Sequence, residues 1–523
     1  MKYQNIIDNM TLKEKAAFLS GKSEWQTRDF PRLDIPAIFC SDGPNGVRKQ
    51  AGAGDHLGIN PAVPATCFPT AAAMANSWDE ELEQRVGVAL GEESMEEDVN
   101  VLLGPGLNIK RNPLCGRNFE YFSEDPYLSG KMAAAFIRGV QSTGAAACAK
   151  HFAVNSQELR RMAMNAVVDE RTLREIYLTG FEIAIKEGGA KTVMSSYNEV
   201  NGVYANENEH LLKDILRDEW GFEGSVITDW GASNDHSLGV KNGSTLEMPT
   251  PGLDAARELL ASVESGKISE KDIDERVDEL LDLVLTTTEN AKHYKKVADK
   301  KALHEEHHKL ARLACENSAV LLKNEDGILP VGAKVQAAII GDFAFDPRYQ
   351  GAGSSMVNST KVDSIKDMLE TSGISVTGIV RGYQRDGKED EAMKKEAVDL
   401  ARRSDVVLFF FGLNEKSETE GLDRKHLRIP QNQINLIQEL AKANANMIGI
   451  ISAGSVIEMP WHHHFKALLH TALMGQAGAG AVLDILSGKV NPSGKLAETY
   501  IKKYEDTPSY NYYPSQERNS EYR

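Results

Sequence analysis

The chain has 523 residues, which is long for one hydrophobic core and predicts two or three domains. Its composition is that of a globular protein, with 41% hydrophobic and 26% charged residues. The formal net charge of -17 disfavours nucleic acid and anionic membranes as partners, because the net electrostatic field repels both.

The start of the chain and its cysteines bear on the cellular compartment. Residues 1–21 lack the apolar core of a signal peptide and instead predict an amphipathic helix with a capping box at Thr11 and Glu14. No apolar run approaches the roughly 18 residues needed to cross a bilayer. The five cysteines lack C-x-x-C spacing, which is typical of free thiols. These features predict a cytoplasmic protein.

The first half of the chain alternates apolar, strand-like runs with amphipathic helices. The runs end in polar or glycine residues and lie at 37–43, 99–109, 144–154, 191–200 and 225–233. This alternation predicts a parallel α/β sheet, a (β/α)8 TIM-like barrel, over residues 1–287. Barrels build active sites at the carboxyl ends of their strands. The polar residues found there are Asp42, Lys150, His151, Tyr197 and Asp229.

The second half begins after a polar, lysine-rich stretch at 288–303, which is the predicted linker. A helical pattern follows, and strand–helix alternation then resumes. It predicts a smaller αβα sandwich domain over residues 304–505. The last stretch, 506–523, is polar and tyrosine-rich without a period, so this tail either packs on another surface or is disordered.

Residues 304–308, "HEEHH", fit H-E-x-x-H, the helical zinc motif of metalloproteases. No third ligand stands at a recognisable spacing. The motif lies on the helix that opens the second half of the chain. We therefore favour a structural role over a metal site.

Four polar stretches carry the candidate chemistry. Asp229 directly follows an apolar strand in "VITDWGAS", where a nucleophile, a base or a helix N-cap would lie. The loop at 116–130 combines Arg117 with carboxylates and aromatics, which suits carbohydrate or an ion pair that fixes the loop. Lys150 and His151 end another strand. The acidic loop at 417–430 is either a solvated loop or part of a site.

Taken together, these stretches resemble glycoside hydrolase family 3, the β-glucosidase type. The matching motifs are "SDGPNGVR", "GRNFEYFSEDP", "KHFAVNSQE", "VMSSYNEVNG", "VITDWGA", "LLKNEDGILP", "QGAGSS", "EGLDR" and "GKLAETY". They occur in the order of the family across nearly the whole chain, which makes the resemblance very specific.

The resemblance implies a barrel followed by an αβα sandwich, with the active site between them. It implies a retaining double displacement in which Asp229 is the nucleophile. Glu420, in "EGLDR", matches the acid/base, and Glu418 is its rival two residues away. The acid must be protonated near neutral pH, so its pKa is expected to be raised. No cofactor and no metal are implied.

The same resemblance implies a first sugar subsite. Its members would be Asp42, Arg117, Lys150, His151, Arg161, Met194, Tyr197 and Trp230, with Ser354 from the second domain closing the site. Asp42 would accept hydrogen bonds from sugar hydroxyls, while Arg117, Lys150 and His151 would donate them.

The chain departs from the family pattern in two places. Thr245 stands where the family often has Asp. The sequence stops at Arg523, where relatives of this arrangement continue into a fibronectin type III-like region. A truncated region of that kind, a naturally short member, a fragment and a split enzyme completed by a second polypeptide are all open, as is a homo-oligomer.

The sequence therefore predicts an exo-acting, retaining β-glucosidase that acts on a β-glucoside or oligosaccharide. A β-xylosidase or another exo-glycosidase of the family, including a phosphorylase, stays open. The alternative from a different class is a non-catalytic sugar-binding protein.

Overall fold

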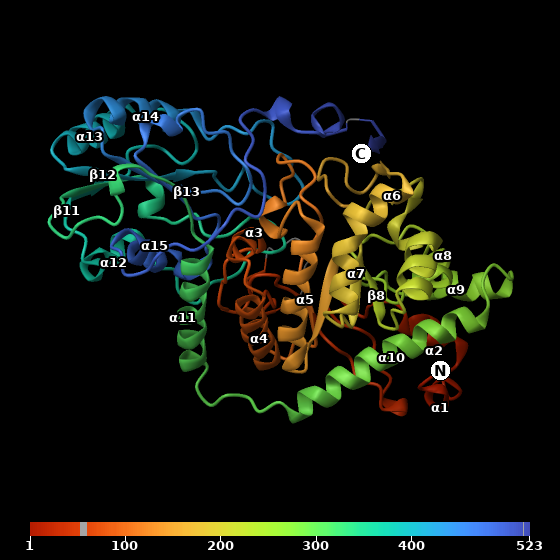
Figure 1. The fold of residues 1–523 in the computed structure, drawn as a ribbon. Helices are drawn as coiled ribbons and strands as arrows, with labels where there is room; N and C mark the ends of the chain where they lie inside the picture. Colours follow the sequence, from red (N-terminus) through yellow and green to blue (C-terminus); the bar gives the residue numbers. More distant parts are fainter. Residues whose placement is uncertain (53–59, 516, 523) are drawn as a thin grey trace.

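The computed structural model describes residues 1–52, 60–515 and 517–522. In Figure 1 the elements up to α10 (Glu270–His293) form one α/β domain, and those from α11 (Lys300–Ser318) to α15 (Gly478–Leu486) form a second beside it. Among the described helices, none combines the length and the apolar character that spanning a membrane requires.

The sheet of the first domain has five parallel strands in the order β1-β2-β3-β5-β8. Their bounds are Cys40–Asp42, Val101–Leu103, Ala146–Phe152, Thr192–Ser195 and Ser225–Thr228. Each predicted apolar run thus contains one strand of this sheet.

Helices cover the two sides of this sheet. One group comprises α4 (Glu80–Glu96), α5 (Pro126–Ser142) and α7 (Thr179–Lys186). The other gathers near β8 and comprises α2 (Leu12–Phe18), α8 (His236–Asn242), α9 (Asp254–Glu264) and α10. The remaining helical segments of the domain include α1 (Gln4–Ile7), α3 (Ala71–Met74), α6 (Glu170–Thr172), η4 (Leu173–Leu178) and η6 (His210–Glu219).

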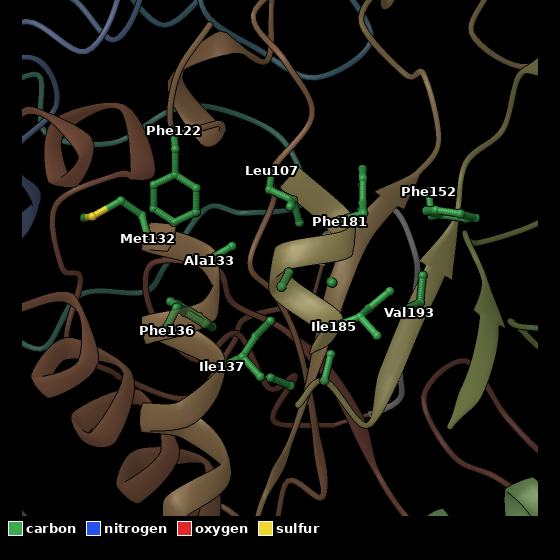
Figure 2. Close-up of a cluster of buried hydrophobic side chains, with 14 of the residues drawn as sticks. Leu107, Phe122, Met132, Ala133, Phe136, Ile137, Phe152, Phe181, Ile185 and Val193 are labelled. Atoms are coloured by element: carbon green, nitrogen blue, oxygen red, sulfur yellow. The ribbon is translucent and has the colours of Figure 1, made fainter. Parts of the chain in front are cut away.

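Alternate strand residues supply two separate cores, as the period of two in a strand requires. Leu102 and Val193 pack with the α4, α5 and α7 side, whereas Val101 and Met194 pack with the α2, α9 and α10 side. Figure 2 shows the first core, in which Phe136 of α5 and Phe181 of α7 lie beside the strands. Burial on both faces explains why the strands read as continuous apolar runs.

This sheet corrects the predicted closed (β/α)8 barrel, because the described residues form a half-barrel. Among the described residues, the curve continues beyond β8 only through isolated parallel bridges, which join Ile227 to Leu246 and Ser20 to Glu247. Single bridges do not make strands, so the barrel is not closed by a continuous ladder.

The predicted linker at 288–303 is largely helical. α10 continues to His293, and α11 begins at Lys300 after the N-cap Asp299, whose side chain accepts from the Ala302 amide. Only residues 294–299 lie between the two helices. Three lysines of this stretch, Lys292, Lys300 and Lys301, belong to the helices, and Lys295 and Lys296 lie in the short connection. Composition alone does not separate the two cases.

The second domain is an αβα sandwich around a six-stranded sheet in the order β11-β10-β12-β13-β14-β9, with only β9 antiparallel. The strands are β9 (Val320–Asn324), β10 (Ala337–Ile340), β11 (Val376–Val380), β12 (Val406–Gly412), β13 (Met447–Ser452) and β14 (Ala467–His470). Helices α13 (Glu391–Arg402) and α14 (Gln431–Ala443) cover one face, and α11, α12 (Ile365–Ser372) and α15 (Gly478–Leu486) cover the other.

The tail at 506–523 packs on the first domain in its described part. β15 (Asn519–Glu521) pairs with β4 (Asn165–Val167) in a small sheet that also holds β6 (Glu199–Val200) and β7 (Val203–Tyr204). Tyr522 is fully buried there. No fibronectin type III-like domain is formed by the described residues.

Candidate active site

A cavity of about 580 Å³ lies between the two domains. The structure brings together every residue that the sequence predicted for the site. Those lining the cavity are Asp42, Arg117, Lys150, His151, Arg161, Met194, Tyr197, Asp229, Trp230, Ser354 and Glu420.

Parallel strands bring the first-domain residues to a common edge. Asp42 ends β1, Lys150 and His151 lie near the end of β3, and Asp229 directly follows β8. The carboxyl ends of parallel strands meet at one side of the sheet, so residues distant in sequence converge there.

Asp229 is buried, and its two carboxylate oxygens differ. Oδ1 accepts from the amide of Trp230 at 2.8 Å. Oδ2 accepts no hydrogen bond from the described residues and lies 3.8 Å from His151 Nε2. The helix that follows is capped by Asp235, so Asp229 is not an N-cap. Burial raises the pKa of Asp229, and Arg117 and Arg161 act in the opposite direction.

Two basic residues of the site, Lys150 and Arg117, lie beside the carboxylates of Asp42 and Glu120. Lys150 Nζ lies 3.5 Å from Asp42 Oδ1 and 3.7 Å from Glu120 Oε1. Arg117 donates through Nε to Glu120 at 2.9 Å and is 1% exposed. Burial raises the pKa of Asp42, while Lys150 and Arg48 oppose that change.

His151 is neutral in this setting. Burial and then Arg117 and Lys150 hold its pKa well below the usual range. Arg117 Nη2 lies 3.1 Å from Nε2, and because arginine can only donate, Nε2 is the acceptor. Nδ1 then carries the proton and donates to Asn108 Oδ1 at 3.2 Å. The sequence predicted His151 as a donor to sugar, whereas here its Nε2 accepts from Arg117.

Aromatic rings form one wall of the cavity. Trp25 and Trp230 pack with ring centroids 4.9 Å apart, and Trp230 donates to the carbonyl of Glu24 at 2.9 Å. Tyr197 donates to the Trp230 carbonyl at 3.0 Å. A fixed aromatic face of this kind suits the C–H face of a sugar ring.

Glu420 enters the cavity from the loop after β12. Its Oε1 lies 2.9 Å from Arg161 Nη1 and 3.9 Å from Arg117 Nη1, and its Oε2 accepts from the Ser354 amide at 2.8 Å. Burial acts to raise its pKa, but Arg117, Arg161 and the Ser354 contact outweigh burial, and the pKa is lowered. This corrects the expectation of a raised pKa, because two arginines face the carboxylate.

Glu418 lies outside the cavity. It is 1% exposed, accepts from Ser455 Oγ at 2.9 Å and lies 3.5 Å from Arg348 Nη2. All these partners belong to the second domain. Of the two rival glutamates, only Glu420 therefore lines the space that contains Asp229.

Several residues of the cavity were missed by the sequence reasoning. They are Trp25, Arg48, Met162, Gly353 and Met356. Arg48 donates to the Ser354 carbonyl at 2.8 Å and lies in the quoted stretch "SDGPNGVR", which was the available signal. The methionines lie in loops without any pattern. Thr245, the departure noted above, is buried away from the cavity and donates to Glu279 at 2.7 Å.

Comparisons with known proteins agree along most of the chain. The Glycosyl hydrolase family 3 N terminal domain matches residues 23–283, and the Glycosyl hydrolase family 3 C-terminal domain matches residues 319–523. Thermostable beta-glucosidase B of Acetivibrio thermocellus is 48% identical over 99% of this chain and 69% of its own length. Exo-alpha-(1->6)-L-arabinopyranosidase of Bifidobacterium longum is 42% identical over the same shares.

Solved structures share the fold. A GH3 beta-glucosidase of Bifidobacterium adolescentis superposes with a TM-score of 0.93 at 42% identity, over 98% of this chain and 74% of the other. Beta-glucosidase 3B of Thermotoga neapolitana, in complex with α-D-glucose, gives a TM-score of 0.91 at 33% identity, over 100% of this chain and 79% of the other. The chain therefore belongs to glycoside hydrolase family 3 and is a glycoside hydrolase.

Proposed function

We propose that the protein is an exo-acting, retaining β-glucosidase, which removes terminal β-linked glucose from small glucosides or oligosaccharides. The observation that carries this proposal is the pair of carboxylates in one cavity. Asp229 comes from the first domain and has a free oxygen, and Glu420 comes from the second domain. Retaining glycosidases use such a pair, one as nucleophile and one as acid/base.

In the first half of the reaction, Asp229 Oδ2 attacks the anomeric carbon and the glycosidic C–O bond breaks. The protonated form of Glu420 gives its proton to the departing oxygen, so the aglycone leaves as a neutral alcohol. The product is a covalent glucosyl ester on Asp229. Arg117 and Arg161 face the glutamate that has become negative and stabilise it after the transfer.

In the second half, Glu420 acts as a base and takes a proton from water. The water oxygen attacks the anomeric carbon, the ester bond to Asp229 breaks, and glucose leaves with its β configuration. The lowered pKa of Glu420 favours the carboxylate that this half-reaction requires.

Sugar recognition in this proposal rests on Asp42, Lys150 and Trp230. Asp42 is held by Lys150 at 3.5 Å and Arg48 at 3.8 Å, and it accepts hydrogen bonds from hydroxyls remote from the bond that is cut. Lys150 donates to hydroxyls, and Trp230 packs on the ring.

A second candidate is an exo-glycosidase for a pentopyranoside. It is favoured by relatives at 42% identity that are named exo-alpha-(1->6)-L-arabinopyranosidase, and it extends the β-xylosidase alternative. A pentopyranose lacks the hydroxymethyl group of glucose. Xylose keeps the glucose configuration at C2, C3 and C4, whereas L-arabinose shares it only at C2 and C3, so these two hydroxyls are common to all three sugars.

The test is hydrolysis followed by proton NMR. 4-Nitrophenyl β-D-glucoside, β-D-xyloside and α-L-arabinopyranoside are compared by kcat/KM at one pH. We expect the glucoside to be cleaved fastest and β-glucose to appear before mutarotation. Release of α-glucose would refute retention. A faster pentoside would replace the glucose assignment, and no turnover of any substrate would leave the sugar-binding alternative.

A further inference from the structure

The loop that carries Glu420 is fastened to the first domain by two carboxylates that the mechanism does not use. Asp423 belongs to this loop, and Glu158 belongs to the first-domain segment after β3. Each accepts hydrogen bonds from the backbone of the other segment. The contact is therefore reciprocal.

Asp423 binds the first domain at three amides. Its Oδ1 accepts from Gly116 at 3.1 Å, and its Oδ2 accepts from Leu159 at 2.9 Å. The Glu158 amide lies 3.2 Å from Oδ1 and 3.1 Å from Oδ2. Both carboxylate oxygens are needed, because Gly116 donates to Oδ1 and Leu159 donates to Oδ2.

Glu158 binds the second domain in return. Its side chain is fully buried, and Oε2 accepts from the amide of Gly421, the residue next to Glu420, at 2.7 Å. The same oxygen lies 2.7 Å from Arg161 Nη1, which is also 2.9 Å from Glu420 Oε1. One guanidinium nitrogen is thus shared between Glu158 and Glu420.

The close approach of the loop is visible at Gly116 as well. A Cβ at this position would overlap the carbonyl oxygen of Leu422, and the Thr419 carbonyl is also near. The first domain therefore leaves room for the loop by the absence of a side chain. Together these contacts fix the backbone on both sides of Glu420.

We propose that Glu158 and Asp423 form a clasp across the domain interface. They are the positioning residues that fix the place of Glu420 and influence its protonation. This inference rests on the acid/base role proposed above for Glu420. Asp423 sets where the loop lies. Glu158 holds the loop at Gly421 and takes a share of Arg161 that Glu420 would otherwise receive alone.

The two members of the clasp have different effects on protonation. The charged or titratable groups of the described residues that face Glu420 or Glu158 are Arg117, Arg161, Asp229, Asp42, Tyr197, Asp423, Tyr121 and Cys115. Removing the charge of Glu158 removes its repulsion of the Glu420 carboxylate. Arg161 then interacts with Glu420 alone, and both changes favour the ionised form of Glu420. Removing the charge of Asp423, whose oxygens accept from the backbone amides of Gly116, Glu158 and Leu159, mainly releases the loop.

The experiment compares kcat/KM for a poor leaving group, phenyl β-D-glucoside, with that for a good one, 2,4-dinitrophenyl β-D-glucoside, across pH. Both values report the first half-reaction, and only the poor leaving group needs the acid. We use the ratio of kcat/KM for the phenyl substrate to kcat/KM for the dinitrophenyl substrate. This ratio follows the protonation of Glu420 in molecules whose Asp229 is ionised. The variants are Glu158→Gln, Asp423→Asn and, as a reference for the acid, Glu420→Ala. Glu415→Gln is the matched control, because its partners Arg348 and Arg385 lie in the second domain.

We expect Glu158→Gln to move the midpoint of the ratio by about one unit to lower pH, which lowers the ratio about tenfold at a fixed pH above it. We expect Asp423→Asn to lower the ratio by up to about 10²-fold without moving the midpoint, because the acid is misplaced. The control should keep the wild-type ratio. A kcat/KM close to wild type with the dinitrophenyl substrate shows that each variant is folded; if Asp423→Asn is not, Asp423→Glu takes its place.

Two failures can be told apart. If Glu420→Ala lowers the ratio but both clasp variants keep the wild-type ratio and midpoint, the clasp is refuted while the proposed function stands. If Glu420→Ala leaves the ratio unchanged, the acid/base assignment is wrong, and the clasp inference is overturned with it.

Discussion

At the scale of single residues, Asp229 and Glu420 are prepared for different tasks. Asp229 has one oxygen held by the Trp230 amide and one without a hydrogen-bond donor among the described residues. Both oxygens of Glu420 are engaged, one by Arg161 and one by the Ser354 amide. A free oxygen suits attack on carbon, and a solvated or ion-paired oxygen suits proton exchange.

Asp229→Asn should lower kcat/KM for 4-nitrophenyl β-D-glucoside by roughly 10³-fold or more, because the covalent step loses its nucleophile. Asparagine has the same shape and can still accept from the Trp230 amide, so the melting temperature should stay near that of the wild type. Steady-state kinetics and thermal denaturation measure both. Activity within tenfold of wild type would exclude Asp229 as the nucleophile.

Glu420→Ala should lower kcat/KM for phenyl β-D-glucoside by about 10²- to 10⁴-fold, since general acid catalysis is lost. The dinitrophenyl substrate should be affected far less, and azide should restore its turnover and yield a glucosyl azide. Glu418→Ala is the matched comparison, because that side chain is buried outside the cavity. If azide rescue follows Glu418→Ala instead, the acid/base is wrongly assigned.

At the scale of elements, each apolar run before a candidate residue contains a strand. The run before Asp229 is β8, and that before Lys150 is the start of β3. Local patterns suffice there because both faces of each strand are buried. They fail near Leu246 and Ser20, where single bridges continue the curve of the sheet without an apolar run. They also fail for Met162 and Met356, whose place in the cavity depends on how two domains meet.

The "HEEHH" segment shows how tertiary contacts decide the role of a short motif. In α11, His307 lies 2.7 Å from Glu93 Oε1 and 3.0 Å from Glu92 Oε2, both on α4 of the first domain. His304 also contacts Glu93, at 3.3 Å. His308 instead lies 2.9 Å from Asp363. The histidines thus pair with carboxylates and join α11 to its neighbours.

This ion-paired histidine predicts a pH-dependent stability. Burial alone would lower the pKa of His307, but its bonds to Glu92 and Glu93 raise that pKa from 6.5 to about 9. A raised pKa in the folded state means that the stabilisation is full below the unfolded value and is lost as pH rises through about 9. The melting temperature of the wild type should therefore fall between neutral pH and pH 9.

His307→Gln should weaken this pH dependence and lower the free energy of unfolding by about 3 kcal/mol at neutral pH, because the buried Glu93 loses a partner. His463→Gln is the control, since that histidine is exposed and its hydrogen bond goes to its local backbone, the Pro460 carbonyl, at 3.0 Å. Thermal melts at several pH values give both quantities. An identical pH dependence in wild type and His307→Gln would contradict this account.

At the scale of the whole molecule, the described part of the tail packs on the first domain. Tyr522 packs against Tyr177 with centroids 5.6 Å apart, and Arg111 lies over its ring at 4.1 Å. Its strand β15 pairs with β4, which follows the segment that bears Glu158 and Arg161. The sequence left open whether this tail packs, because a polar stretch without a period gives no sign of a partner.

Tyr522→Ala should reduce the free energy of unfolding by about 3 kcal/mol, the usual cost of removing a buried aromatic ring. Because β4 follows the Arg161 segment directly, kcat should also fall several-fold. Tyr510→Ala, at a tyrosine that is 39% exposed, is the control and should change neither value appreciably. Chemical denaturation and kinetics give both readouts. A Tyr522 variant as stable as the control would show that the tail contributes no packing.

The central claim is that Asp229 forms a covalent bond to glucose, and one measurement tests it directly. The protein is exposed to 2-deoxy-2-fluoro-β-glucosyl fluoride, whose fluoride leaves without an acid while the fluorine at C2 slows release. Mass spectrometry should show one added fluoroglucosyl group, on the peptide "GSVITDWGASNDH" and on Asp229 within it. A label on another carboxylate, or no label from either this reagent or its xylosyl counterpart, would contradict the account.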